Sequence, residues 1–127
     1  MIRLLNAHLP WMLMMMVISV QSSMSNLKLP DLGFNFLDKI IHLFVFGILG
    51  WLIARGMFKS GHPFIQKHFL LFTLLIGGIF GLMDEWHQSM VPGRMADIQD
   101  WLADITGIVL FGFYYKWKIY KEAQAPG

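Results

Sequence analysis

The sequence predicts an all-α integral membrane bundle of four transmembrane helices, with both termini in the cytoplasm. Of the 127 residues, 56% are hydrophobic and only 14% are charged, whereas globular domains are about 45–50% apolar and about 25% charged. The apolar residues fall into four runs, at about residues 7–21, 38–58, 68–88 and 100–118. A spanning helix needs roughly 20 such residues. A chain of this length forms one membrane domain, residues 1–127.

The first apolar run, residues 7–21, reaches the length of a span only if its ends are included. Pro10 fits the first turn of a helix, where its missing N–H costs nothing. The alternative is a signal peptide that begins with the basic Arg3 and ends with small residues around 22–25. Because the run starts with proline and the cleavage site lacks alanine, we favour a retained helix. A loop is expected over residues 22–37.

Small residues mark the places where helices can pack closely. Gly47 and Gly50 in the second run, and Gly77 and Gly81 in the third, recur at helical spacing. Such positions let a neighbouring helix approach. They permit a homo-oligomer without requiring one. The second run opens with Asp38, where a capping or first-turn acid belongs.

The remaining connections are short. Residues 59–67 read as a basic turn, and residues 91–93 (Val-Pro-Gly) read as a second turn. The fourth run ends in alternating aromatic and lysine residues over 114–121, which is typical of a membrane interface. Residues 122–127 are predicted to be disordered.

Lysine and arginine predict the orientation, because their excess marks the cytoplasmic side. One face of the predicted bundle carries seven of the ten, namely Arg3, Arg55, Lys59, Lys67, Lys116, Lys118 and Lys121. The other face carries three, namely Lys28, Lys39 and Arg94. Both termini are therefore expected in the cytoplasm, and the loops at residues 22–37 and 84–99 are expected to face outward.

Ionisable residues gather at the outward face. Five of the eight acidic residues lie in one stretch, namely Asp84, Glu85, Asp97, Asp100 and Asp104. Asp38 and His42 are four residues apart, as are Asp84 and Gln88, so each pair shares one side of its helix. Three predicted helices thus place polar groups at the same depth in the membrane. Charge is costly at a membrane boundary, so function is the default hypothesis for such groups.

Taken singly, these residues have ordinary explanations. Asp38 can simply start a helix, His42 can be a satisfied polar residue, and Arg94 can pair with Asp97 or Asp100 to fix a loop. Taken together they are harder to explain by stability, because buried pairs cost about as much desolvation as they return. Clustered carboxylates suit acid–base work, and they also suit a divalent cation.

We therefore assign candidate roles. The candidate catalytic residues are Asp84, Glu85 and His42, with a carboxylate as general base and the imidazole as its proton partner. The candidate ligand-binding residues are Asp38, Gln88, Arg94, Asp100 and Asp104, of which Arg94 can hold a phosphate or carboxylate with two hydrogen bonds. No metal site is assigned, although oxygen ligands for a divalent cation are available on Asp84, Glu85 and Asp100.

Composition excludes other classes of site and partner. The chain has no cysteine, so disulfides and thiolate metal sites are ruled out. Its formal net charge is only +2, and its basic residues are scattered between the apolar runs. A nucleic-acid partner is therefore not expected, since that would require a basic patch or stripe.

The same residues form dispersed motifs: Asp38-Lys39-x-x-His42, Asp84-Glu85-x-x-Gln88, Pro92-Gly93-Arg94 and Asp100-x-x-x-Asp104-x-x-Gly107. In this order, over about residues 38–112, they resemble the VanZ-like family. These are small bacterial membrane proteins named for a protein that raises resistance to the glycopeptide teicoplanin. The resemblance implies a multi-pass protein of the bacterial cytoplasmic (inner) membrane and cell envelope. Where Asp104 stands, the family often has asparagine.

Two functions follow as hypotheses, and the resemblance leaves open whether the protein is an enzyme. In the first, the outward-facing polar site binds an anionic membrane lipid, an envelope precursor, a glycopeptide or a membrane partner, and contributes to teicoplanin-type resistance. In the second, the protein is a membrane-embedded enzyme that acts on a lipid or cell-wall precursor by carboxylate acid–base or metal-assisted chemistry. A proton relay or transporter is a weaker third, because the acids lie at one end of the spans.

Overall fold

The computed structural model describes residues 2–24 and 35–125, and all regular structure within these ranges is helical. The prediction of an all-α protein is therefore confirmed. The five helices are α1 (Ile2–Ser22), α2 (Asn35–Phe58), α3 (Pro63–Lys67), α4 (Phe69–Ser89) and α5 (Ile98–Gln124).

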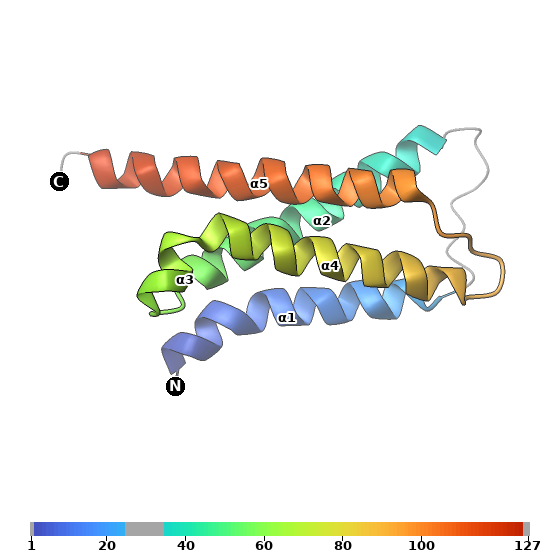
Figure 1. Ribbon diagram of the computed structural model, residues 1–127, viewed down its shortest axis with the longest axis horizontal. Helices are drawn as coiled ribbons and strands as arrows, with labels where there is room; N and C mark the ends of the chain where they lie inside the picture. The colour runs from blue at the N-terminus through green and yellow to red at the C-terminus, as the bar shows by residue number, and fades with distance from the viewer. Residues whose placement is uncertain (1, 25–34, 126–127) are drawn as a thin grey trace.

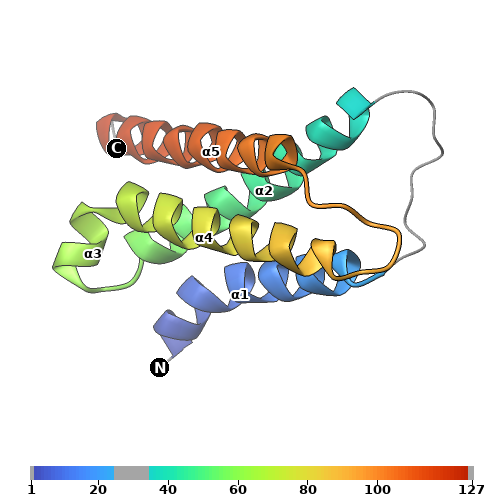
Figure 2. The same cartoon turned by 45° about the vertical axis from the view of Figure 1, so that its right-hand side comes forward.

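The four long helices run alternately in opposite directions (Figure 1). The first residues of α1 and the last residues of α5 lie at the same end of the bundle as α3, and the α4–α5 loop lies at the opposite end (Figures 1 and 2). α2 is the central helix, since it packs against α1, α4 and α5. Within the described residues, α1 packs against α2 and α4 but not against α5.

α2 and α5 form the most extensive helix pair, and glycines make it close. A Cβ at Gly50 would lie 2.7 Å from the Cα of Ile108, and a Cβ at Gly107 would collide with the backbone carbonyl of Leu43. The two backbones are thus in direct contact, as small residues allow. Gly50 was expected to admit a neighbouring helix, and it does so within this chain.

The prediction for Pro10 is wrong. α1 begins at Ile2, so Pro10 lies inside the helix and not in its first turn. Its ring lacks the N–H that would bond the carbonyl of Asn6. The Arg55 guanidinium supplies the missing donor, with Nη1 lying 3.0 Å from that carbonyl oxygen. A contact from α2 therefore satisfies the group that proline leaves unpaired.

Other helix ends also differ from expectation. α2 begins at Asn35, before the predicted end of the loop of residues 22–37. Residues 25–34 of that loop lie outside the described part of the chain. Asp38 is the first-turn acid, as predicted. The basic turn of residues 59–67 contains the short helix α3, which opens on a proline.

The C-terminal helix is longer than predicted. α5 continues to Gln124, so residues 122–124 are helical and the prediction of disorder there is wrong. Lys118 and Glu122 lie one turn apart, with Nζ 3.8 Å from Oε1, a spacing that supports a helix on its surface. Residues 126–127 lie outside the described part of the chain.

Within the described residues, three helices are long and apolar enough to cross a membrane, namely Ile2–Ser22, Phe36–Phe58 and Phe69–Ser89. Large apolar side chains are exposed on each of them, for example Met16 (58%) on α1 and Ile79 (58%) on α4. Exposed apolar surface on this scale is suited to lipid. α5 is not among the three; its first two turns carry Asp100 and Asp104.

Candidate functional site

The centre of the site is a contact between α2 and α5 at the end of the bundle that carries the α4–α5 loop. His42 Nδ1 lies 2.9 Å from Asp104 Oδ1. The Asp104 side chain is fully buried, and the His42 side chain is 15% exposed. The close approach at Gly107, one turn beyond Asp104, brings the two helices near enough for this contact. The ring of Phe46 lies nearly parallel to the imidazole, with the ring centroids 6.4 Å apart.

α4 contributes Glu85 to the same centre. Glu85 is buried, and its Oε2 accepts a hydrogen bond of 3.0 Å from the backbone N–H of Asp97. Its Oε1 and the Asp104 Oδ2 are both buried and have no hydrogen-bond partner among the described residues. A nitrogen of His42 and one oxygen each of Glu85 and Asp104 lie within 4.8 Å of one another. Such unpartnered buried oxygens are costly and call for an explanation.

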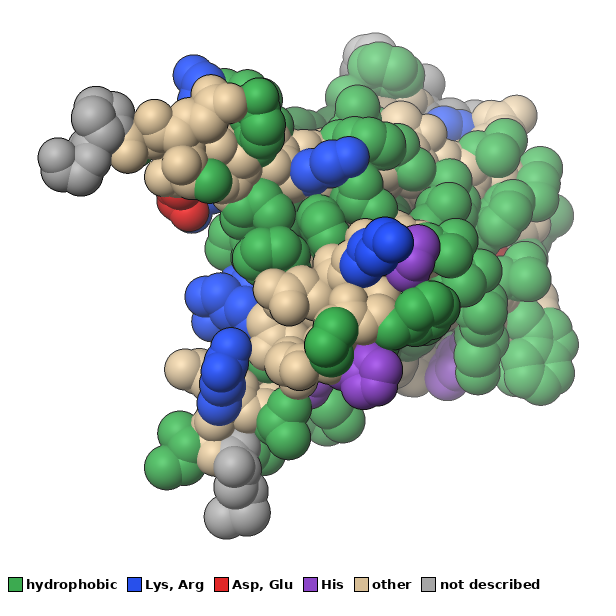
Figure 3. Space-filling view, turned by 60° about the vertical axis from the view of Figure 1, so that its left-hand side comes forward, with side chains coloured by type: hydrophobic (Ala, Val, Ile, Leu, Met, Phe, Trp, Pro, Cys, Tyr) green, Lys and Arg blue, Asp and Glu red, His purple; other side chains and the backbone are tan. Residues whose placement is uncertain are grey.

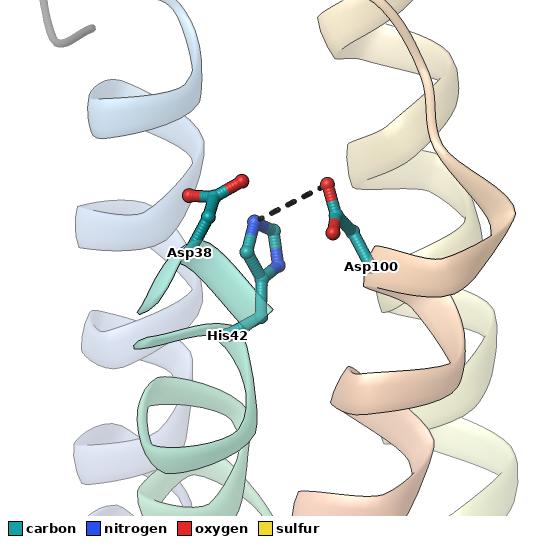
Figure 4. Close-up of side chains that lie close together, drawn as sticks. All are labelled: Asp38, His42 and Asp100. Carbon is teal, nitrogen blue, oxygen red and sulfur yellow. Dashed lines mark ion pairs between the residues drawn. The ribbon is translucent and has the colours of Figure 1, made fainter. Parts of the chain in front are cut away.

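Lys39, on α2, forms ion pairs with two aspartates of the site. Its Nζ lies 2.8 Å from Asp100 Oδ1 and 3.1 Å from Asp97 Oδ2. Asp100 also faces His42, with its Oδ2 4.0 Å from Nε2 (Figure 4). Figure 4 shows the exposed carboxylate of Asp38 near the same imidazole, and these three residues form a second group whose ligand atoms lie within 4.8 Å.

Asp97 fixes the start of α5. It caps the helix by accepting a 2.8 Å hydrogen bond from the backbone N–H of Gln99. That hydrogen bond and the Lys39 ammonium lower the pKa of the Asp97 carboxyl below its usual range. The cap and the ion pair together hold the first turn of α5 against α2.

Asp84 belongs to a neighbouring polar group on the α1 side. Gln88 Nε2 donates to Asp84 Oδ2 over 2.9 Å and to Ser22 Oγ over 3.4 Å. All three side chains are buried. The predicted spacing of Asp84 and Gln88 thus produces a hydrogen bond, and Gln88 links that pair to α1.

Arg94 does not form the pairs that seemed most ordinary from the sequence. Within residues 2–24 and 35–125 it makes no ion pair, and Lys39 takes both Asp97 and Asp100. It follows the predicted turn, in which Gly93 has a φ of 81°. Only glycine adopts this backbone conformation readily. Arg94 is half-buried in the α4–α5 loop.

The structure therefore separates the candidate residues into three places. His42, Glu85, Asp100 and Asp104 meet at the α2–α4–α5 centre with the exposed Asp38 at its edge, Gln88 links Asp84 to α1, and Arg94 lies in the loop. Sequence reasoning named Lys39 in the Asp38-Lys39-x-x-His42 motif but assigned it no role in the site. Its signal was the three-residue spacing to His42, which puts both on one side of the helix.

A comparison with protein-family models supports the sequence resemblance. The model of the VanZ/LLP1 family matches residues 4–119. The chain belongs to the VanZ/LLP1 family. The match extends beyond the motif-bearing residues 38–112 and includes most of α1 and most of α5. No curated protein and no solved structure matches the chain. Family membership and the apolar helices together make it a membrane protein of the VanZ type.

Two kinds of chemistry are open to the centre. An imidazole held by a carboxylate can accept and return a proton, which is the basis of general acid–base catalysis. A nitrogen and several carboxylate oxygens can also bind a divalent cation. Both uses need the buried acidic groups that the structure places beside His42.

Proposed function

We propose that this protein crosses the bacterial inner membrane four times and uses its outward-facing polar site to bind an anionic group of the cell envelope. The observation that carries the proposal is the His42–Glu85–Asp104 centre, in which two buried carboxylate oxygens have no hydrogen-bond partner among the described residues. If these acids only supported the fold, the protein would be more stable with both oxygens hydrogen-bonded or with the acids replaced. Groups that cost stability in this way are common where a ligand is bound.

The proposed fourth span is α5. At about 1.5 Å per residue, its 27 residues extend about 40 Å, enough to cross a bilayer. Apolar side chains are exposed along it at helical spacing, namely Leu102, Val109, Leu110, Phe113 and Trp117. Its inner face buries Asp100, Asp104 and Gly107 against the other helices. The two aspartates of α5 are thus turned away from the proposed lipid.

The distribution of charge supports the orientation. Figure 3 looks onto the end of the bundle that carries α3 and shows Lys, Arg and His side chains spread over it. At this end Lys118 and Lys121 lie over the rings of Trp51 and Trp117. The basic excess supports the proposal that this end faces the cytoplasm. The His42 centre then faces the outside, where envelope lipids, cell-wall precursors and glycopeptides are found.

Arg94 is the residue best suited to contact the ligand. It makes no ion pair with the residues described and lies in the loop beside the site. A guanidinium binds phosphate or carboxylate with two parallel hydrogen bonds. Binding of an envelope precursor or of the glycopeptide itself would account for a contribution to teicoplanin-type resistance.

The absence of cysteine permits a direct test of the orientation. Single cysteines at Gln66 on α3 and Gln99 on α5 form a matched pair, since both positions are exposed. In intact spheroplasts, a membrane-impermeant thiol reagent should label Gln99→Cys and leave Gln66→Cys unlabelled until the membrane is opened. The reverse pattern, or labelling of both, would refute an outward-facing site.

The binding role is tested with purified protein and defined lipids. Native mass spectrometry should show the wild type retaining an anionic phospholipid or a lipid-linked cell-wall precursor in preference to a zwitterionic lipid. Arg94→Gln should lose this preference, and the control Lys116→Gln at the other end should keep it. In a susceptible host, expression of the wild type and of Lys116→Gln should raise the teicoplanin concentration that inhibits growth. Equal retention of all lipids by the wild type would contradict the binding role.

A second candidate function is favoured by one observation, the 2.9 Å contact that orients the His42 imidazole against a buried carboxylate. This is the arrangement of a histidine general base, and it would suit an enzyme acting on a lipid or cell-wall precursor. Incubating the protein with the lipids it retains and analysing them for cleavage or transfer products distinguishes the two. Products made by the wild type and lost in His42→Asn would favour the enzyme.

A further inference from the structure

We infer that His42, Glu85 and Asp104 bind one divalent transition-metal ion at the buried end of the site. The inference deepens the proposed function, because a bound cation would let an acidic site hold an anionic group that its carboxylates would otherwise repel. It is tested on protein and metal alone. Its failure is therefore distinguishable from a failure of lipid binding.

The first argument is geometric. Three side chains from three different helices each offer one ligand atom, and these atoms lie within 4.8 Å of one another. Nitrogen and oxygen ligands bind such ions at about 2.0–2.2 Å, so ligands on opposite sides of one ion are about 4.2 Å apart. The three atoms therefore already lie close to the spread that one ion requires.

The second argument comes from the carboxylate oxygens themselves. One oxygen of Glu85, Oε2, is anchored by the backbone N–H of Asp97, and Asp104 Oδ1 lies 2.9 Å from Nδ1 of His42, itself a proposed ligand. The other oxygen of each acid is buried and has no hydrogen-bond partner among residues 2–24 and 35–125. A supporting hydrogen bond of the kind made to Glu85 typically orients a metal-binding carboxylate. An ion bound by these two oxygens would supply the partner that each of them lacks.

The ligand set indicates the kind of ion. Imidazole with carboxylates suits Mn²⁺, Fe²⁺, Co²⁺ or Zn²⁺, whereas Ca²⁺ takes about 6–8 oxygen ligands. The nearby group of Asp38, His42 and Asp100 is a poorer site. Asp38 is exposed, and Asp100 already accepts from Lys39.

The test titrates metal-stripped full-length protein in detergent with Mn²⁺. Electron paramagnetic resonance counts the bound ion, and its pulsed form detects an imidazole nitrogen on it. The wild type should bind one equivalent with nitrogen coupling, and Zn²⁺ should displace it. Glu85→Gln and Asp104→Asn should weaken binding about 100-fold or more, since loss of an outer-shell partner alone costs roughly 10–100-fold. Glu122→Gln, the matched control at the other end of the bundle, should bind like the wild type.

Three results would overturn the inference. The first is a wild type that binds neither Mn²⁺ nor Zn²⁺, and the second is a bound ion that shows no nitrogen coupling. The third is a loss in Asp38→Asn as large as that in Glu85→Gln, which would move the ion to the other group. Variants are compared only if circular dichroism shows wild-type helix content. The stoichiometry and nitrogen coupling of the wild type decide the question even if a variant fails to fold.

Discussion

Replacing Glu85 with glutamine should stabilise the metal-free protein while weakening the proposed metal binding. Glu85 is 5% exposed, and its Oε1 is buried with no hydrogen-bond partner among the described residues. An unsatisfied buried group costs about 1–3 kcal/mol. The glutamine oxygen can keep the 3.0 Å hydrogen bond from Asp97, while its amide replaces a buried negative charge beside Asp104 with a donor. We therefore expect a gain of about 1–2 kcal/mol in the free energy of unfolding.

The measurement is an unfolding titration in mixed detergent micelles, followed by circular dichroism, with a chelator present. Glu122→Gln is the matched control, because Glu122 is exposed and its contact with Lys118 is 3.8 Å long. Its effect should be smaller than about 0.5 kcal/mol. A loss of more than about 1 kcal/mol in Glu85→Gln would show that the carboxylate supports the fold and would refute the reasoning.

Three further predictions concern the frame around the site. Gly107→Ala should lower the free energy of unfolding by about 1–3 kcal/mol, because its Cβ would meet the backbone of α2. The control Gly112→Ala, whose Cβ would have its nearest contact at 3.5 Å, should be close to neutral in the same titration. Lys39→Met should destabilise the protein by leaving two acids unpaired, and adding Asp97→Asn should restore part of the loss in a double-mutant cycle. The pKa of the Asp97 carboxyl is lowered in the folded protein, so its contribution to stability should be full above its ordinary pKa and be lost as the pH falls through the folded value. Denaturation at several pH values should therefore show that Asp97→Asn loses less stability in acid than the wild type does.

The sequence predicted the elements that depend on local pattern. Apolar runs gave the long helices, and the four-residue spacing gave the contact between Asp84 and Gln88. The common depth of His42 and Asp104 predicted that they could meet, since both lie one turn or two inside the same end of the bundle. These predictions needed only the helical period and the direction of each helix.

The remaining features depend on tertiary contacts. Neighbouring residues on a helix point about 100° apart, so the sequence does not decide whether Asp84 or Glu85 faces α5. Glu85 does, because the path of the loop brings the Asp97 N–H to it. Pro10 was placed by a local rule, and a contact from Arg55 in another helix overrides that rule.

The central claim is that the buried acids serve a ligand and not the fold. The most direct test is thermal unfolding of the wild type, Glu85→Gln and Glu122→Gln in detergent, each with and without Mn²⁺. We predict that Mn²⁺ raises the melting temperature of the wild type and of Glu122→Gln, and leaves Glu85→Gln unchanged. The claim would be contradicted if Mn²⁺ stabilised none of the three and Glu85→Gln melted well below the wild type.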